Sequence, residues 1–257
     1  MKAELENAYV LHSRAFKDTS LLVDFFTENF GRITLVAKGA RQQKKKGNFL
    51  LQPFVSLKIS WQGRGQLKTL TSTEIITATV DADNNEIIDI DKNNNRLEKK
   101  YLYSGFYANE LLTYLLPFDE PNADIFYLYD NLLKALKNKF NLEKILRLFE
   151  FSLLSELGYG IDFIHVSISG DLIEAGKQYY YDPSEGFVSL NALDTIDANL
   201  ELGPIVHRHV FDGRVILGVY GQEYNDETVR QAAKYIARKS MDNILLGKKI
   251  KSRDFFK

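Results

Sequence analysis

The basic residues that follow one predicted strand have the type and spacing needed to bind a phosphate backbone. Lys38 and Arg41 are close together, and a run of three lysines follows them: Lys44, Lys45 and Lys46. Lysine supplies a point charge, and arginine supplies a planar fork of donors for phosphate oxygens. A basic loop beside a small barrel can follow a nucleic-acid backbone while aromatic side chains stack on bases. The alternative interpretation is a charge run that only contacts water.

A second set of basic residues lies near the end of the chain. Arg230, Lys234 and Arg238 recur every four residues, which places them on one face of a predicted helix. We predict that this face and the tail form a second polyanion surface; a solvated helix face is the alternative. A weaker candidate is Arg64, in a turn between two predicted strands. The basic residues of the tail are Lys248, Lys249, Lys251 and Arg253.

Motifs of catalysis are missing from the sequence. It contains no Gly-x-x-x-x-Gly-Lys-[Ser/Thr] motif for nucleotide phosphates and no Gly-x-Ser-x-Gly motif for a serine nucleophile. His207 and His209 could share a strand face, but the further ligands of a metal site are lacking. The absence of cysteine excludes disulfides, thiol nucleophiles and zinc sites that use cysteine. We therefore expect a protein that is not an enzyme and has no cofactor or metal; a nuclease built from scattered carboxylates is the alternative.

Residues 7–78 predict the element that would position the first basic loop. Short segments rich in β-branched and aromatic residues alternate with turn signals, and a longer polar connection covers residues 38–49. Five such strands favour an oligonucleotide-binding (OB) barrel, and half of a β-sandwich is the competitor. The predicted strands cover residues 8–12, 20–26, 32–37, 54–61 and 67–75. The aromatic residues that could stack on bases are Tyr9, Phe16, Phe25, Phe26, Phe54 and Trp61, although most must fill the core.

The rest of the chain predicts an α+β protein. Apolar residues at helical spacing indicate helices over 101–115, 125–136 and 143–157, with Asn141 as a cap and Gly158 as a stop. A β-hairpin is expected near 179–189, and a last helix capped by Asp226. We expect a barrel at 1–80, a polar linker at 81–98, a helical bundle at 99–160, and a small mixed region at 161–257 packed on the bundle and lacking zinc.

Composition and charge agree with a globular protein that binds polyanions. The chain has 257 residues, is 45% hydrophobic and has a formal net charge of -1. This value hides two basic ends: residues 1–80 hold 12 Lys and Arg against 6 Asp and Glu, and residues 229–257 hold 9 against 2. Local patches decide polyanion binding, so the small net charge does not oppose it. No apolar run is long enough for a membrane span and the acidic first residues predict no signal peptide, so a cytoplasmic, nucleoid-associated protein is expected.

Several ordered motifs resemble those of the RecO family of bacterial recombination mediators, over nearly the whole chain. One covers Leu35-Val36-Ala37-Lys38-Gly39-Ala40-Arg41, and others lie in the barrel, the helices and the tail. The resemblance implies an OB domain, a helical bundle and a third region that holds a cysteine zinc site in many members. The lack of cysteine places this chain with the zinc-free members. The further motifs include Leu51-Gln52-Pro53-Phe54, Arg147-Leu148-Phe149-Glu150, Leu157-Gly158-Tyr159-Gly160 and Lys251-Ser252-Arg253.

The resemblance also implies function and partners. It implies binding of single- and double-stranded DNA, annealing of complementary strands, association with RecR, and help in loading RecA onto DNA coated by single-stranded-DNA-binding protein (SSB). The family binds the acidic C-terminal tail of SSB on the helical bundle. We expect Arg147, assisted by Lys144, to receive that tail; the alternative is surface ion pairs of Arg147 with Glu143 and Glu150. An adaptor for SSB and RecR with little DNA affinity of its own is the competing function.

Overall fold

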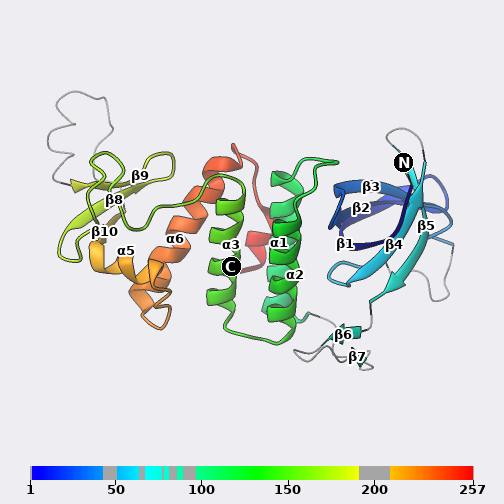
Figure 1. Cartoon of the computed structure of the whole chain (residues 1–257), viewed down its shortest axis with the longest axis horizontal. Helices are drawn as coiled ribbons and strands as arrows, with labels where there is room; N and C mark the ends of the chain where they lie inside the picture. Colours follow the sequence, from blue (N-terminus) through cyan, green and yellow to red (C-terminus); the bar gives the residue numbers. More distant parts are fainter. Residues whose placement is uncertain are drawn as a thin grey trace. The chain divides into compact units, whose positions relative to one another are not determined.

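The computed structural model divides the chain into two compact units (Figure 1). The barrel unit comprises Met1–Phe140 and Ile250–Lys257, and the second unit comprises Asn141–Lys249. Among the described residues, no helix combines the length and the apolar character that crossing a membrane requires. The structure describes residues 2–42, 51–63, 67–76, 78–80, 86–88, 97–190 and 209–256.

Five strands of the barrel unit close into a barrel in the order β1-β2-β3-β5-β4. Neighbouring strands are antiparallel except β3 and β5, which pair in parallel through Leu35–Lys68 and Val36–Thr69. This topology is that of an OB fold, so the predicted barrel is confirmed. The strands are β1 (Lys2–Phe16), β2 (Ser20–Thr27), β3 (Gly31–Ala37), β4 (Leu57–Gln62) and β5 (Lys68–Ile75).

Apolar side chains that point inward from all sides fill the barrel, and Phe25 and Trp61 are fully buried among them. Tyr9, Phe26 and Phe54 are buried as well, so five of the six aromatic candidates for base stacking serve the core. Phe16, at the end of β1, is only half-buried. Of the six aromatic candidates, Phe16 is therefore the one whose ring is accessible to a ligand.

Two helices of the barrel unit, α1 (Lys99–Leu115) and α2 (Ala123–Lys137), pack on the outer side of β1 and β2. The Tyr9 and Phe26 rings lie 5.6 and 5.5 Å from the Phe126 ring of α2. Asn109 of α1 donates to the Leu11 carbonyl of β1 at 3.0 Å. The helices thus cover one side of the barrel through aromatic contacts and buried hydrogen bonds.

The loop after α1 lies against the start of β3, where Gly31 permits a very close approach. The Asp119 backbone N–H donates to the Arg32 carbonyl at 2.8 Å, and Lys68 Nζ lies 2.8 Å from Asp119 Oδ1. Gly31 has φ +64°, and a Cβ at this position would lie 1.9 Å from the Glu120 carbonyl oxygen. Only glycine meets both conditions, so this residue fixes the loop to the barrel.

Among its described residues, the second unit combines a three-stranded sheet with three helices. The sheet has the order β10-β8-β9, and the predicted hairpin is confirmed as β8 and β9. Asp226 caps α6, as predicted, by accepting from the Thr228 and Val229 amides. The elements are α3 (Leu142–Glu156), β8 (Gln178–Asp182), β9 (Gly186–Ser189), β10 (Val210–Asp212), α5 (Gly213–Tyr220) and α6 (Glu227–Ile244).

Packing and strand pairing hold the stretch from His165 to Phe187. The Ser167 amide donates to the Phe187 carbonyl at 2.8 Å, and Val166 and Phe187 are buried in the core of the second unit. His165 pairs with Leu172 in an isolated antiparallel bridge, and its ring lies 2.8 Å from the Asp162 carboxylate. These contacts agree with the prediction that this region is stabilised without thiolate ligands.

The compact units divide the chain differently from the four predicted segments, which remain a prediction. The three predicted helices of the bundle are present, but α1 and α2 belong to the barrel unit, whereas α3 packs on α6 in the second unit. The 3-10 helix η2 (Lys251–Phe256) returns to the barrel unit and packs on α1. Much of the predicted linker lies outside the described residues. Its described strand β7 (Glu86–Ile88) pairs with β6 (Ala78–Val80), which directly precedes the linker.

Candidate nucleic-acid interface

Two turns meet at one end of the barrel and hold the first predicted basic residues. The turn between β1 and β2 packs against the turn that follows β3, because the Arg41 amide donates to the Thr19 carbonyl at 2.9 Å. The Arg41 guanidinium also donates to the Lys17 carbonyl at 3.1 Å. Gly39 adopts φ +69°, which lets the chain reverse between Lys38 and Arg41. We call this end of the barrel the barrel tip.

Four exposed cations lie at the barrel tip: Arg14, Lys17, Lys38 and Arg41. Lys38 and Arg41 were predicted from the sequence, whereas Arg14 and Lys17 were missed. The sequence prediction ended the first strand at residue 12, so it did not place the following turn beside residues 38–41. The other predicted members of this loop, Lys44, Lys45 and Lys46, lie outside the described residues, as does Arg64.

The barrel tip has the chemistry for a nucleic-acid backbone. Its four cations face an aqueous surface with Asp18 as the acidic residue of the β1–β2 turn. The half-buried Phe16 ring lies 5.5 Å from Lys17 Nζ, so an aromatic face and a cation are neighbours. Bases can stack on aromatic rings while Lys and Arg neutralise phosphates. The structure thus brings together, at one place, the two kinds of group that single-strand binding needs.

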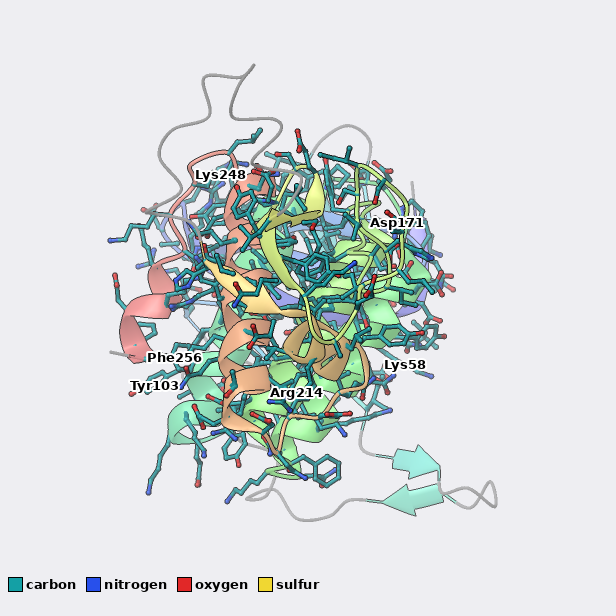
Figure 2. All side chains as sticks on the ribbon, turned by 90° about the vertical axis from the view of Figure 1, so that its left-hand side faces the viewer. Lys58, Tyr103, Asp171, Arg214, Lys248 and Phe256 are labelled. Atoms are coloured by element: carbon teal, nitrogen blue, oxygen red, sulfur yellow. The ribbon has the colours of Figure 1, made fainter. Side chains whose placement is uncertain are left out.

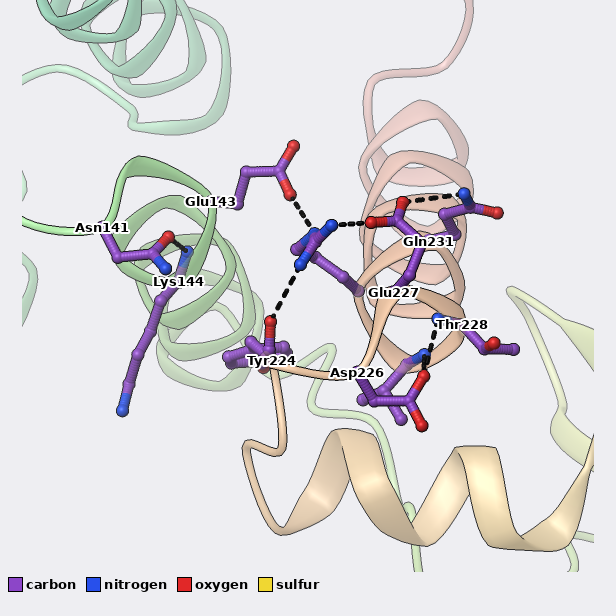
Figure 3. Close-up of polar contacts among 10 residues, drawn as sticks. Asn141, Glu143, Lys144, Tyr224, Asp226, Glu227, Thr228 and Gln231 are labelled. Carbon is purple, nitrogen blue, oxygen red and sulfur yellow. Dashed lines mark hydrogen bonds and ion pairs between the residues drawn. The ribbon is translucent and has the colours of Figure 1, made fainter.

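The basic residues of α6 differ in their surroundings, and Figure 3 shows Glu143, Tyr224 and Glu227, the partners of the first of them. Arg230 Nε lies 2.8 Å from the Glu143 carboxylate of α3, Nη2 pairs with the Glu227 carboxylate, and Nη1 donates to the Tyr224 carbonyl at 3.3 Å. Its donors therefore serve two carboxylates and a carbonyl within the second unit. Lys234 and Arg238 are exposed one and two turns later. We keep these two residues as polyanion candidates and interpret Arg230 as a link between α3 and α6.

The basic tail is divided between the two compact units. Lys248 and Lys249 are exposed in the second unit, and Lys251 is exposed at the start of η2 in the barrel unit. The Arg253 guanidinium lies 5.8 Å from the Tyr107 ring of α1, so this side chain is packed on the helix. The basic residues of the tail thus belong to both compact units, and the second polyanion surface stays a prediction.

Arg147 is largely buried within the second unit. Arg147 Nη2 lies 2.7 Å from Glu150 Oε2, and the two side chains are 9% and 1% exposed. Among the described residues, Arg147 Nε and Nη1 find no hydrogen-bond partner. Burial raises the pKa of the neighbouring Tyr224 hydroxyl; Arg147 opposes the rise and Glu150 adds to it. Lys144, one turn earlier, is exposed. Of the two ion pairs in the alternative interpretation, the structure shows the one with Glu150, whereas the Glu143 carboxylate pairs with Arg230.

The described residues contain no group of three His, Cys, Asp or Glu side chains that could hold a metal ion. The His209 ring packs edge-on against the Tyr235 ring at 4.0 Å, which is an ordinary packing contact. His207, the other histidine considered as a ligand, lies outside the described residues.

Comparison with known proteins gives the same assignment along the whole chain. The family model "Recombination protein O N terminal" matches residues 1–79, and "Recombination protein O C terminal" matches residues 98–202. The chain is similar to "DNA repair protein RecO" of Haemophilus influenzae (strain 86-028NP), with 39% identity over 100% of this chain and 97% of that protein. Proteins of the same name from Cellvibrio japonicus (strain Ueda107) and Pasteurella multocida (strain Pm70) are 37% and 35% identical, over 100% of this chain and 98% and 97% of theirs.

The barrel topology, the basic barrel tip and these similarities agree with one another. The identity exceeds one third and extends over both compact units. A role in recombinational repair follows from this membership. The chain belongs to the RecO family of DNA repair proteins.

Proposed function

We propose that the protein is a non-enzymatic recombination mediator that binds single- and double-stranded DNA and anneals complementary strands. With RecR, it would help to load RecA onto single strands coated by SSB, near the nucleoid. The observation that carries the proposal is the barrel tip, where Arg14, Lys17, Lys38 and Arg41 gather beside Phe16 on an OB barrel. The competing adaptor function would give these cations no ligand, so we do not favour it.

Annealing needs contact with two strands at once. The barrel tip supplies one proposed contact, and Lys234 and Arg238 on α6, with Lys248 and Lys249, supply another in the second unit. Phosphate binding at both places would bring two strands together without nucleotide hydrolysis. The direct test is annealing of SSB-coated complementary strands in the absence of ATP. If the protein leaves the annealing rate unchanged, the proposal is wrong.

The double variant Lys38→Ala/Arg41→Ala should bind single-stranded DNA more weakly without unfolding. Each lost phosphate contact should lower the slope of log affinity against log salt by roughly 0.7 for a single strand. Titration of a labelled oligonucleotide at several salt concentrations measures this slope. Lys58→Ala is the matched control, because Lys58 is an exposed lysine on β4. A variant slope equal to that of the control would remove the barrel tip from the proposed function.

We also propose that Arg147 and Lys144 receive the acidic tail of SSB. The support is chemical: Nε and Nη1 of the Arg147 guanidinium lack a partner in the described structure and can donate to a carboxylate, and an exposed lysine lies one turn away. A charge-assisted bond of this kind contributes roughly 1.5–3 kcal/mol to binding.

A test of the proposed SSB-tail site requires a variant that removes the charge of Arg147 without leaving the buried Glu150 carboxylate unpaired. Arg147→Met/Glu150→Leu does so, and we expect it to bind a synthetic acidic peptide with an apolar C-terminal residue at least tenfold more weakly than the wild type. Binding of bare single-stranded DNA should be unchanged. Lys144→Ala should show a smaller loss for the peptide. Equal peptide affinity for the wild type and the double variant would exclude Arg147 from the site.

A further inference from the structure

Large aromatic side chains gather in the open on the barrel unit, where η2 packs on α1. Tyr103 and Phe106 of α1 are 37% and 38% exposed, and Phe255 and Phe256 of η2 are 57% and 43% exposed. Phe255 stacks on Tyr103 at 5.1 Å between ring centroids, and Phe256 meets Tyr103 edge-on at 6.4 Å. Figure 2 shows Tyr103 and Phe256 at the same edge of the molecule. We call these four side chains the tail aromatic surface.

A specific anchor fixes the tail aromatic surface in place. The Glu110 carboxylate of α1 accepts from the Lys251 and Ser252 amides at 2.8 Å each, and from the Ser252 hydroxyl at 2.7 Å. It thereby satisfies the first free N–H groups of η2, as a helix cap does. Ile250 and Ser252 are each 3% exposed. The segment is thus held firmly on one side while its two phenylalanines remain in water on the other.

Contiguous exposed aromatic groups of this kind mark interaction sites, since they are unfavourable in water without a partner. Phe255 is covered on one side by Tyr103 and is still more than half exposed, so its other face is open. Phe106 also rests on a buried ring, that of Phe54, at 5.1 Å. One face of each ring thus packs on the protein, and the open face can stack with another planar group.

The charges around the tail aromatic surface favour an anionic partner. Lys99 and Lys100 are exposed in the first turn of α1, which contains no acidic residue. Lys251 is exposed at the start of η2. The Glu110 carboxylate is occupied by the anchor, and Glu98 lies 3.8 Å from the ammonium of Lys139. Asp254 is the exposed acidic residue of η2 itself. Cations beside open rings are the combination that binds bases and phosphates together.

We propose that the tail aromatic surface is a binding site for the unstacked bases of single-stranded DNA, with Lys99, Lys100 and Lys251 contacting its phosphates. The inference rests on the proposed function and extends it to a second DNA contact on the barrel unit. Duplex DNA keeps its bases stacked on one another, so this surface selects single strands. An apolar peptide residue would instead require a pocket that encloses it, which rings open to water on one face do not supply.

The test compares two labelled strands of equal length, oligothymidylate and an abasic strand that has only the sugar-phosphate backbone. Phe255→Ala/Phe256→Ala should bind oligothymidylate roughly tenfold more weakly, as expected for loss of base stacking, and should bind the abasic strand as the wild type does. Tyr220→Ala is the matched control, because Tyr220 is a 60% exposed aromatic residue of the second unit. Its affinity for both strands should be that of the wild type.

A spectroscopic variant gives an independent readout. Phe255→Trp should retain binding, and base stacking should quench the fluorescence of the new indole, whereas Trp61, the natural tryptophan, is fully buried. An unchanged oligothymidylate affinity in the double alanine variant would overturn the inference, and so would an equal loss for both strands. Loss of binding to the acidic peptide in place of DNA would assign the surface to a protein partner. If Lys38→Ala/Arg41→Ala still weakens DNA binding in those cases, only this inference fails; if the wild type binds neither strand, the proposed function fails with it.

Discussion

Gly31→Ala is expected to destabilise the barrel unit by roughly 3–5 kcal/mol, the combined effect of a left-handed backbone angle and a steric clash. The new Cβ would lie 1.9 Å from the carbonyl oxygen and 2.4 Å from the carbonyl carbon of Glu120. Both are backbone atoms, so rotation of a side chain cannot relieve the overlap. The loop that carries Asp119 would have to leave β3 and break its bonds to Arg32 and Lys68. Chemical denaturation followed by circular dichroism measures the loss.

Gly39→Ala is the matched control for this experiment. Gly39 has a similar φ of +69°, but a Cβ there meets no atom within 4 Å. It should therefore lose only the contribution of the backbone angle, about 1–2 kcal/mol. If the two alanine variants lose the same stability, the contact with Glu120 is not the reason that residue 31 is a glycine.

Arg147→Ala is expected to destabilise the second unit by roughly 3–5 kcal/mol, because it removes the guanidinium that lies 2.7 Å from a carboxylate with 1% exposure. Arg147→Met/Glu150→Leu removes both charges together and should be close to neutral or stabilising, since apolar residues can replace a buried ion pair. Denaturation curves of the two variants decide the point. Equal stability of Arg147→Ala and the wild type would contradict the buried position of the pair. The large effect also means that loss of function in Arg147→Ala alone cannot identify a ligand contact.

The elements of the barrel could be predicted from the sequence because period-two alternation and turn residues are local signals. The full length of β1 could not, since its two halves pair with different strands. Residues from Lys2 to Ala8 pair with β4, and residues from Ala8 to Phe16 pair with β2. This continuation is what carries Arg14 and Lys17 to the barrel tip. The positions of Arg14 and Lys17 therefore could not be predicted from the local pattern of each strand alone.

The helices were predicted correctly as helices, but an apolar stripe does not tell which neighbour covers it. The stripe of α3 packs on α6, a partner that lies more than seventy residues later in the chain. The sequence does contain a signal for the burial of Arg147. Leu154 follows Arg147 by two helical turns and belongs to the apolar stripe, so Arg147 shares its face.

The return of Ile250–Lys257 to the barrel unit has a consequence for how the protein matures during synthesis. Domains tend to fold in order as the chain emerges from the ribosome. Here Glu110 can bind the amides of Lys251 and Ser252 only after the entire second unit has been synthesised. Until then the barrel unit carries an unneutralised carboxylate on α1 where Lys251 and Ser252 will bind. The segment Ile250–Lys257 can thus bind only at the end of synthesis. A nascent chain that stalls within the second unit would carry the barrel tip but lack Phe255 and Phe256 of the tail aromatic surface.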